Sequence, residues 1–292
     1  LLISSIVHAQ FTFKGTINNY PNKRVIVKLD RAFDDILIGN TTTDTSGIFS
    51  LPIKEKYSGI IEVSLLDAKK NFTFISDNTN IDFKATIDKD GNFVLTNPGN
   101  PINTTYKNYL NFDTKKKSVL PQLEYISGSY KPEDSFYTPL LQEIKTISEL
   151  KEPSLSSYPF LTYYIAASNL IKETETGEPA SGKKAIIDHL TNAGEEFETS
   201  GLGRSMLYNY MRLSASGASS QADWENKVDV AIQQLLDEIG EDTSRGQETL
   251  SGVINFLNSY SITNLATKYM NRAESLTCEI TPELKETINR NN

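Results

Sequence analysis

Hydrophobic and polar residues alternate with a period of two along the first third of the chain. The clearest runs are Phe11–Ile17, Arg24–Leu29, Phe49–Ile53 and Ile60–Leu65. Such alternation places one side of each strand in a core and the other side in water. Short strands separated by turn sequences are typical of two packed antiparallel sheets. The pattern therefore predicts an antiparallel β-sandwich domain over residues 11–97.

Two turn sequences give this domain its expected connections. Asp44-Thr45-Ser46-Gly47 stands between Arg24–Thr43 and Ser50–Leu66, and we expect it to join these two runs in a β-hairpin. Asp88–Asn92 resembles a calcium loop but lacks its closing Glu, which favours a second hairpin turn.

The period changes at Asn97-Pro98-Gly99-Asn100-Pro101, because two prolines and a glycine end the sheet. From there to residue 290 the apolar positions repeat with helical spacing. Short loops between successive helices imply antiparallel neighbours, so residues 102–290 are predicted to form an α-helical bundle or a short stack of helical hairpins. Ser154–Glu175 is apolar nearly all round and is expected to be the most buried helix. The predicted fold class is segregated α+β.

The first ten residues have a separate character. Leu1–Gln10 is apolar at first and ends in Val7-His8-Ala9, where small residues three apart suit a signal peptidase. We interpret residues 1–10 as the remnant of a secretory signal peptide, which implies a periplasmic or cell-envelope location; the alternative is a first strand over residues 3–7. Later segments fall short of the roughly 18 apolar residues that span a bilayer, so the exported protein is expected to be soluble, with no membrane span.

Charge is distributed unevenly. Residues 1–100 hold 11 Lys and Arg against 11 Asp and Glu, and the remaining residues hold 18 against 26, so the formal net charge of −8 arises in the helical part. An acidic surface repels the phosphate backbone, and nucleic acid is therefore not an expected partner.

Candidate catalytic and metal-binding groups are sparse. Cys278 is the single cysteine, and His189 is the single histidine beyond the predicted signal peptide. Neither has the neighbouring ligands that a metal site or a nucleophilic site needs. Adjacent carboxylates such as Glu195-Glu196 suit solvent-facing helix ends, and a carboxylate hydrolase is only a weak alternative. No cofactor and no catalytic motif are predicted, which leaves enzymatic activity uncertain.

Tyrosine content is the most distinctive feature of the helical part, which holds 12 of the 14 tyrosines. Tyrosine buries a large apolar ring yet keeps a polar tip, and it is enriched where proteins bind other proteins. The candidate partner-binding residues are Tyr130, Tyr137, Tyr158, Tyr163 and Tyr164. The alternative is that these side chains pack between helices and against the β-domain.

A family resemblance is carried by the order of the strand segments. The segments are Phe11–Ile17, Val25–Leu29, Thr43–Phe49, Phe72–Ile75 and Ile81–Phe83. This order resembles the small β-domain that begins many exported thiol:disulfide oxidoreductases of Bacteroidetes-type bacteria. In those proteins a signal peptide, this β-domain and a helical region precede a thioredoxin-like domain of the TlpA/ResA kind. The resemblance extends by motif to about residue 100 and by architecture beyond it.

The redox chemistry of that family resides in a Trp-Cys-x-x-Cys motif, which these 292 residues lack, since Trp224 has no adjacent cysteine and Cys278 has no partner. The resemblance therefore implies the non-catalytic N-terminal region of such a protein. We expect a fragment that recognises client proteins or positions a C-terminal thioredoxin-like domain absent from this chain. The alternative is a self-contained periplasmic binding or adhesion module for a peptide or glycan.

Overall fold

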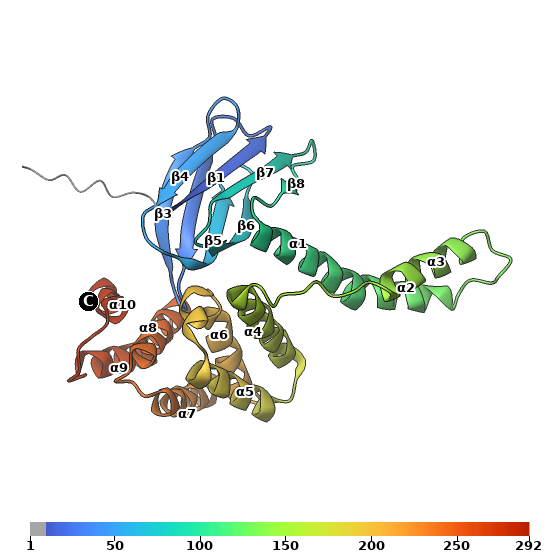
Figure 1. Cartoon of the computed structure of the whole chain (residues 1–292). Coiled ribbons are helices and arrows are strands. Elements are labelled where there is room, and N and C mark those ends of the chain that lie inside the picture. The colour runs from blue at the N-terminus through green and yellow to red at the C-terminus, as the bar shows by residue number, and fades with distance from the viewer. Residues whose placement is uncertain (1–9, 292) are drawn as a thin grey trace, which may run out of the picture.

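The computed structural model describes residues 10–291, and the predicted signal peptide, apart from Gln10, lies outside the described residues. A β-sandwich packs on a helical body, and a long helical hairpin extends sideways from their junction (Figure 1). We refer to this hairpin, residues 101–148, as the arm. The segregated α+β class predicted from the sequence is confirmed.

The sandwich contains β1 (Phe11–Asn18), β2 (Arg24–Asp30), β3 (Asp35–Thr42), β4 (Ile48–Ile53), β5 (Ser58–Leu65), β6 (Lys70–Asp77), β7 (Ile81–Ile87) and β8 (Phe93–Asn97). Within the described residues these strands form two four-stranded sheets, ordered β4-β1-β7-β8 and β3-β2-β5-β6. Neighbouring strands are antiparallel except for β1 and β7, which run parallel. The hairpin predicted at Asp88–Asn92 joins β7 to β8.

The hairpin predicted at Asp44–Gly47 is wrong, although the turn itself forms. The Asp44 carboxylate accepts the amides of Ser46 at 2.8 Å and Ile48 at 2.9 Å, and Gly47 has a φ of 76°. The turn nevertheless carries the chain from β3 in one sheet to β4 in the other, where β4 pairs with β1. A turn sequence specifies where the chain reverses, whereas the pairing edge depends on which face of each strand enters the common core.

Phenylalanine rings fill the space between the sheets. Phe13 lies 5.4 Å from Phe74, and Phe74 lies 4.5 Å from Phe83, measured between ring centroids. All three side chains are almost fully buried, and each ring removes a large apolar area from water. This core makes the sandwich a firm support for the helices packed on it.

The arm consists of α1 (Pro101–Thr114), a π-helical segment η1 (Lys115–Val119), α2 (Leu120–Ser127) and the returning helix α3 (Tyr137–Ser148). Pro121 accounts for the π-segment. Proline has no amide hydrogen and its ring crowds the preceding turn, so the helix widens. The amide of Leu120 accordingly bonds the carbonyl of Lys115, five residues back. The widened turn keeps α1 and α2 continuous.

The helical body contains α4 (Pro159–Thr176), α5 (Pro179–Asn192), the 3-10 segment η2 (Glu195–Thr199), α6 (Gly203–Ser214), α7 (Gln221–Ile239), α8 (Ser244–Ser259), α9 (Thr263–Glu274) and α10 (Pro282–Asn291). The expectation that Ser154–Glu175 forms the most buried helix is wrong. Nine of the 16 residues of α8 are buried against six of 18 in α4. The reason is that α8 packs against α6, α7, α9 and α10, whereas α4 covers only the edge of the body.

The loop between β2 and β3 fastens the sandwich to the body. Ala32 and Phe33 belong to the hydrophobic core of the helices, not to that of the sheets. The amide of Gly203 donates to the Ala32 carbonyl at 2.8 Å, and Nε of Arg204 donates to the Phe33 carbonyl at 2.7 Å. The sandwich therefore contributes two residues of this loop to the core of the helical body.

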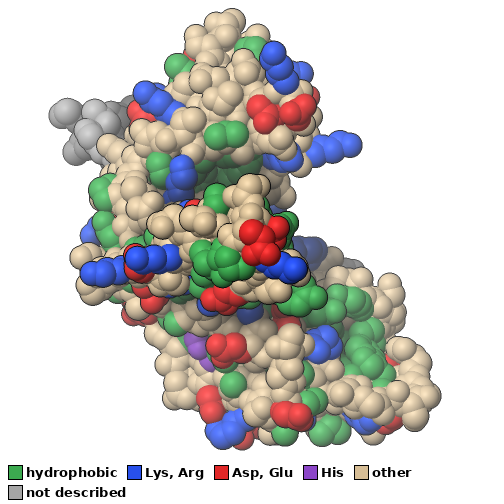
Figure 2. Space-filling model, turned by 90° about the vertical axis from the view of Figure 1, so that its right-hand side faces the viewer, with side chains coloured by type: hydrophobic (Ala, Val, Ile, Leu, Met, Phe, Trp, Pro, Cys, Tyr) green, Lys and Arg blue, Asp and Glu red, His purple; other side chains and the backbone are tan. Residues whose placement is uncertain are grey.

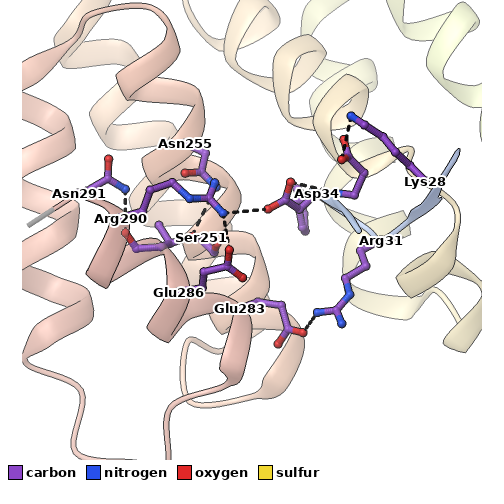
Figure 3. A network of polar contacts seen from close by, with 12 residues as sticks. Lys28, Arg31, Asp34, Ser251, Asn255, Glu283, Glu286, Arg290 and Asn291 are labelled. Atoms are coloured by element: carbon purple, nitrogen blue, oxygen red, sulfur yellow. Dashed lines mark hydrogen bonds and ion pairs between the residues drawn. The ribbon is translucent and has the colours of Figure 1, made fainter. Parts of the chain in front are cut away.

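Ion pairs surround the same loop on its outer side (Figure 3). Asp34 lies between two arginines, 2.9 Å from Arg204 and 3.7 Å from Arg290, and Arg31 pairs with Glu283 of α10. These contacts hold the last helix of the chain against the sandwich.

Candidate functional site

Large apolar side chains are exposed at the far end of the arm. Tyr125 is 85% exposed, and Ile126, Tyr130 and Phe136 are exposed beside it. We refer to these four residues as the arm tip. Figure 2, seen from the side to which the arm points, shows apolar side chains gathered on this part of the surface with charged side chains around them. A contiguous exposed apolar patch of this kind marks an interaction surface more often than scattered apolar residues do.

Local hydrogen bonds order the turn that carries the arm tip. The amide of Lys131 donates to the Asp134 carboxylate at 2.7 Å, and the amide of Asp134 donates to the Lys131 carbonyl at 2.9 Å. The rings of Tyr130 and Phe136 pack edge to face across the turn, 5.3 Å apart. An ordered turn lowers the entropy cost of binding, because the exposed rings are already positioned.

Few contacts hold the two sides of the arm together. Leu140 and Ile147 are the buried residues of α3, and Nζ of Lys116 donates to the Ser148 carbonyl at 2.6 Å. None of the α2 side chains is buried. The arm is therefore only two helices thick, and most of its surface is available to a partner.

Acidic groups outnumber basic ones around the arm tip. The charged residues of α2 and of the turn that follows it are Glu124, Lys131, Glu133 and Asp134. A partner that combines apolar side chains with basic ones would complement this surface both in shape and in charge.

The structure separates the five predicted partner-binding tyrosines into two groups. Tyr130 belongs to the arm tip, and Tyr137 is half-buried at the start of α3. Tyr158, Tyr163 and Tyr164 lie at or near the start of α4, where they are half-buried against the hydrophobic cores. The structure thus brings Tyr130 and Tyr137 together on the arm and places the other three at the junction with the body.

Tyr163 packs against the core of the helical body, whereas Tyr164 packs against a smaller apolar cluster between the sandwich and the helices α1 and α4. The Tyr163 hydroxyl forms a hydrogen bond of 2.8 Å with Nε2 of His189, and burial lowers the pKa of that imidazole. The Tyr164 ring packs edge to face with Tyr106 at 6.0 Å. Burial raises the pKa of both tyrosines, so both hydroxyls stay protonated at neutral pH.

Tyr125, Ile126 and Phe136 were missed as site residues. A sequence signal for Tyr125 exists, because it lies just before the Ser127-Gly128-Ser129 turn and has Pro121 and Gln122 four and three positions earlier, so no helical stripe would bury it. Ile126 gives no such signal, since it continues the stripe of Val119 and Leu123. Phe136 has helical spacing to Leu140 and Ile147 in the sequence, which predicts a place in a buried stripe, but α3 begins one residue later and leaves this ring exposed at the turn.

One carboxylate pair lies between the body helices. Burial and the neighbouring Glu198 carboxylate raise the pKa of Glu248. Nε of Arg245 donates to Glu198 at 2.8 Å, and Nη1 of Arg245 donates to the Ala193 carbonyl at 2.6 Å. Because the same guanidinium holds the end of α5, we interpret this group as a structural ion pair.

The remaining chemistry is limited. Sγ of Cys278 lies 3.3 Å from the side-chain amide of Gln247, which donates to it. Between residues 10 and 291 no three His, Cys, Asp or Glu side chains come together as metal ligands. No helix in that range is long and apolar enough to cross a bilayer.

Comparisons with known proteins returned no matching family model and no matching curated protein.

Proposed function

We propose that this chain is the non-catalytic N-terminal region of an exported thiol:disulfide oxidoreductase of the TlpA/ResA kind, in which the arm tip recognises client polypeptides. Support for the redox family comes from the strand motifs of residues 11–83, above all Asp44-Thr45-Ser46-Gly47-Ile48-Phe49, and from the order of β-domain and helical region. The client-recognition role rests on a single observation, the exposed apolar surface at the end of the arm.

The expected client is a non-native polypeptide. Disulfide exchange requires access to cysteines that a folded client would bury, so an oxidoreductase benefits from a surface that binds exposed apolar segments. Tyr125, Ile126, Tyr130 and Phe136 offer such a surface, and the acidic residues around them favour a basic client. The arm also extends away from the body, which leaves room for a bulky unfolded chain (Figure 1).

The binding role is tested with hen lysozyme that has been reduced and blocked with iodoacetamide. The blocked lysozyme polypeptide is basic and unfolded, and it cannot form disulfides. Native lysozyme is the matched control, because it has nearly the same net charge but is folded. We expect saturable binding of the unfolded form in fluorescence anisotropy and no binding of the native form. Tyr125→Ser combined with Phe136→Ser should weaken binding at least about fivefold.

A second double variant controls for general loss of apolar surface. Leu37→Ser with Val94→Ser removes two comparably exposed side chains from the sandwich, and it should bind unfolded lysozyme like the wild type. Equal loss in both double variants, or no binding by the wild type, would refute client recognition by the arm.

The redox assignment has its own test. Sequencing the DNA that follows codon 292 in the source genome should find an in-frame Trp-Cys-x-x-Cys motif. A reading frame without that motif would remove the oxidoreductase assignment while leaving the binding result intact.

A further inference from the structure

A second surface feature lies on the helical body, away from the arm. A cavity of about 580 Å³ opens between α6 and α8, and residues of α4, α10 and the β2–β3 loop complete its lining. This volume falls within the roughly 300–1,000 Å³ of small-molecule sites. None of its lining residues belongs to the arm, so the cavity is separate from the proposed client-binding surface.

Aromatic rings form one side of the cavity. Tyr208 and Tyr260 lie nearly parallel, with centroids 6.4 Å apart, and Phe256 lies 4.7 Å from Tyr260. Tyr208 is 45% exposed and Tyr260 is 56% exposed, although large aromatic side chains are usually buried to a greater extent. Their rings therefore offer flat apolar faces to a ligand in the cavity.

Hydrogen-bond donors and acceptors line the remaining wall of the cavity. Arg204 and Arg290 supply donors, Asp34 and Glu175 supply acceptors, and their formal charges cancel. The Asn209 side chain is 3% exposed, and the hydrogen bonds described for it are both donated by its Nδ2, to the Ile171 carbonyl and to Thr174 Oγ1. A cavity with balanced charge and mixed donors and acceptors suits a neutral ligand that has many hydroxyl groups.

The cavity is held in shape before any ligand arrives. Phe33 forms part of its lining, and this ring packs against Gly203 and Gly252 so closely that a Cβ on either glycine would lie within 3 Å of it. Arg204 is also held in place, because its Nε donates to the Phe33 carbonyl at 2.7 Å and its Nη2 donates to the Asp34 carboxylate at 2.9 Å. The same Asp34 lies beside Arg290, as Figure 3 shows. Ligand binding therefore requires little reorganisation.

We propose that this cavity binds a neutral saccharide of one or two sugar rings. A pyranose ring has an apolar face of C–H groups that stacks on an aromatic ring, and its hydroxyls both donate and accept hydrogen bonds. Tyr208 and Tyr260 match the apolar face, and Arg204, Asp34 and Asn209 match the hydroxyls. A charged ligand fits less well, because each arginine of the cavity already faces Asp34.

The experiment uses the full chain and four neutral disaccharides: maltose, cellobiose, lactose and N,N′-diacetylchitobiose. Two-dimensional NMR titration should give saturable shifts with at least one of them below about 20 mM, the range of weak carbohydrate binding. Tyr208→Ala and Tyr260→Ala should each weaken that binding roughly three- to tenfold. Both side chains are exposed, so an unchanged melting temperature is expected and separates lost binding from lost folding.

Val94→Ala, which changes an apolar side chain on β8 that is 48% exposed, comparable with Tyr208 and Tyr260, is the matched control and should bind the disaccharide like the wild type. The proposal is overturned if none of the four sugars saturates, or if Tyr208→Ala and Tyr260→Ala bind like the wild type. Saturable binding of the tripeptide Gly-Tyr-Gly in the same cavity, without sugar binding, would also overturn it and would assign the cavity to peptides.

Discussion

The ring of Phe33, a loop residue of the sandwich, lies so close to Gly252 of α8 that a Cβ on Gly252 would stand 2.6 Å from Cδ1 of the ring. Glycine in a helix is usually destabilising relative to alanine, by roughly 0.5–1 kcal/mol. Its presence at this buried position is explained by the contact, because only a residue without a side chain lets the β2–β3 loop enter the helical core. The joining of the two domains therefore depends on this pair.

Gly252→Ala should destabilise the protein by about 1–3 kcal/mol, the usual cost of adding a methyl group to a packed core. The intrinsic helix preference of alanine would predict the opposite sign. Urea denaturation followed by circular dichroism measures the difference. Gly128→Ala, at a helix end where a Cβ meets only the Tyr125 carbonyl at 3.6 Å, is the control and should be nearly neutral.

A double variant isolates the contact. In a Phe33→Ala background, itself expected to cost about 3 kcal/mol or more, the cavity left by the ring accommodates the new methyl group. Gly252→Ala should then be neutral or stabilising. Equal destabilisation by Gly252→Ala in both backgrounds would show that Phe33 is not the reason for the glycine.

Asp30 should make the stability of the protein depend on pH. Its side chain is 8% exposed, and burial, followed by the nearby charges of Glu62 and Asp35, raises the pKa of Asp30 to about 7, although Arg204 and Lys28 oppose the shift. Between the unfolded pKa of 3.8 and about 7, the folded state holds a proton that the unfolded state has lost. The contribution of Asp30 to the free energy of unfolding therefore falls as the pH rises through this range, by up to about 4 kcal/mol.

Asp30→Asn keeps the shape of the side chain and removes its charge. We expect this variant to match the wild type near pH 4 and to exceed it in stability above pH 7, measured by urea denaturation at a series of pH values. An unchanged profile for Asp30→Asn would show that the Asp30 carboxylate is ionised in the folded protein.

The sequence predicted the segregated α+β fold because both periodicities are strong and local. Period-two alternation and the Asn97–Pro101 break depend on neighbouring residues alone. The pairing of β4 with β1 is not local, and the turn at Asp44–Gly47 carries no information about it. Ala32 and Phe33 were likewise unpredictable as helical-core residues, since they follow a strand and their partners lie about 170 to 220 residues further along the chain.

The candidate site could be predicted only in outline. Tyrosine enrichment pointed to the helical part, but adjacent residues such as Tyr163 and Tyr164 face different surroundings, which composition cannot distinguish. The arm arises because α1, η1 and α2 form one continuous helix through Pro121, a residue that ordinarily suggests a helix end. Exposure of Tyr125 follows from that continuity and not from any motif.

We expect Tyr163 and Tyr164 to contribute to the stability of the fold and not to partner binding. Tyr163→Phe removes the hydrogen bond to His189 and should cost about 1 kcal/mol, and Tyr164→Ala removes ring contacts with Tyr106 and should cost about 2 kcal/mol. Binding of unfolded lysozyme should be unaffected in both. Weakened binding at unchanged melting temperature would instead assign these tyrosines to the partner surface.

The arm should unfold independently of the rest of the protein. Its hairpin depends on Leu140 and Ile147, the two buried residues of α3, whereas the sandwich and the helical body each have an extensive core of their own. Ile147→Ala therefore removes about half of the buried side chains of α3, and we expect it to open α2 and α3 locally at a cost of about 2–4 kcal/mol. Hydrogen exchange measured by mass spectrometry should show faster exchange in residues 120–148 and unchanged protection in α8.

Ile144→Ala, which changes a half-buried neighbour on the same helix, is the control and should increase exchange in the arm clearly less than Ile147→Ala does. If Ile147→Ala raised exchange in the arm and in α8 equally, the arm would be part of the global folding unit.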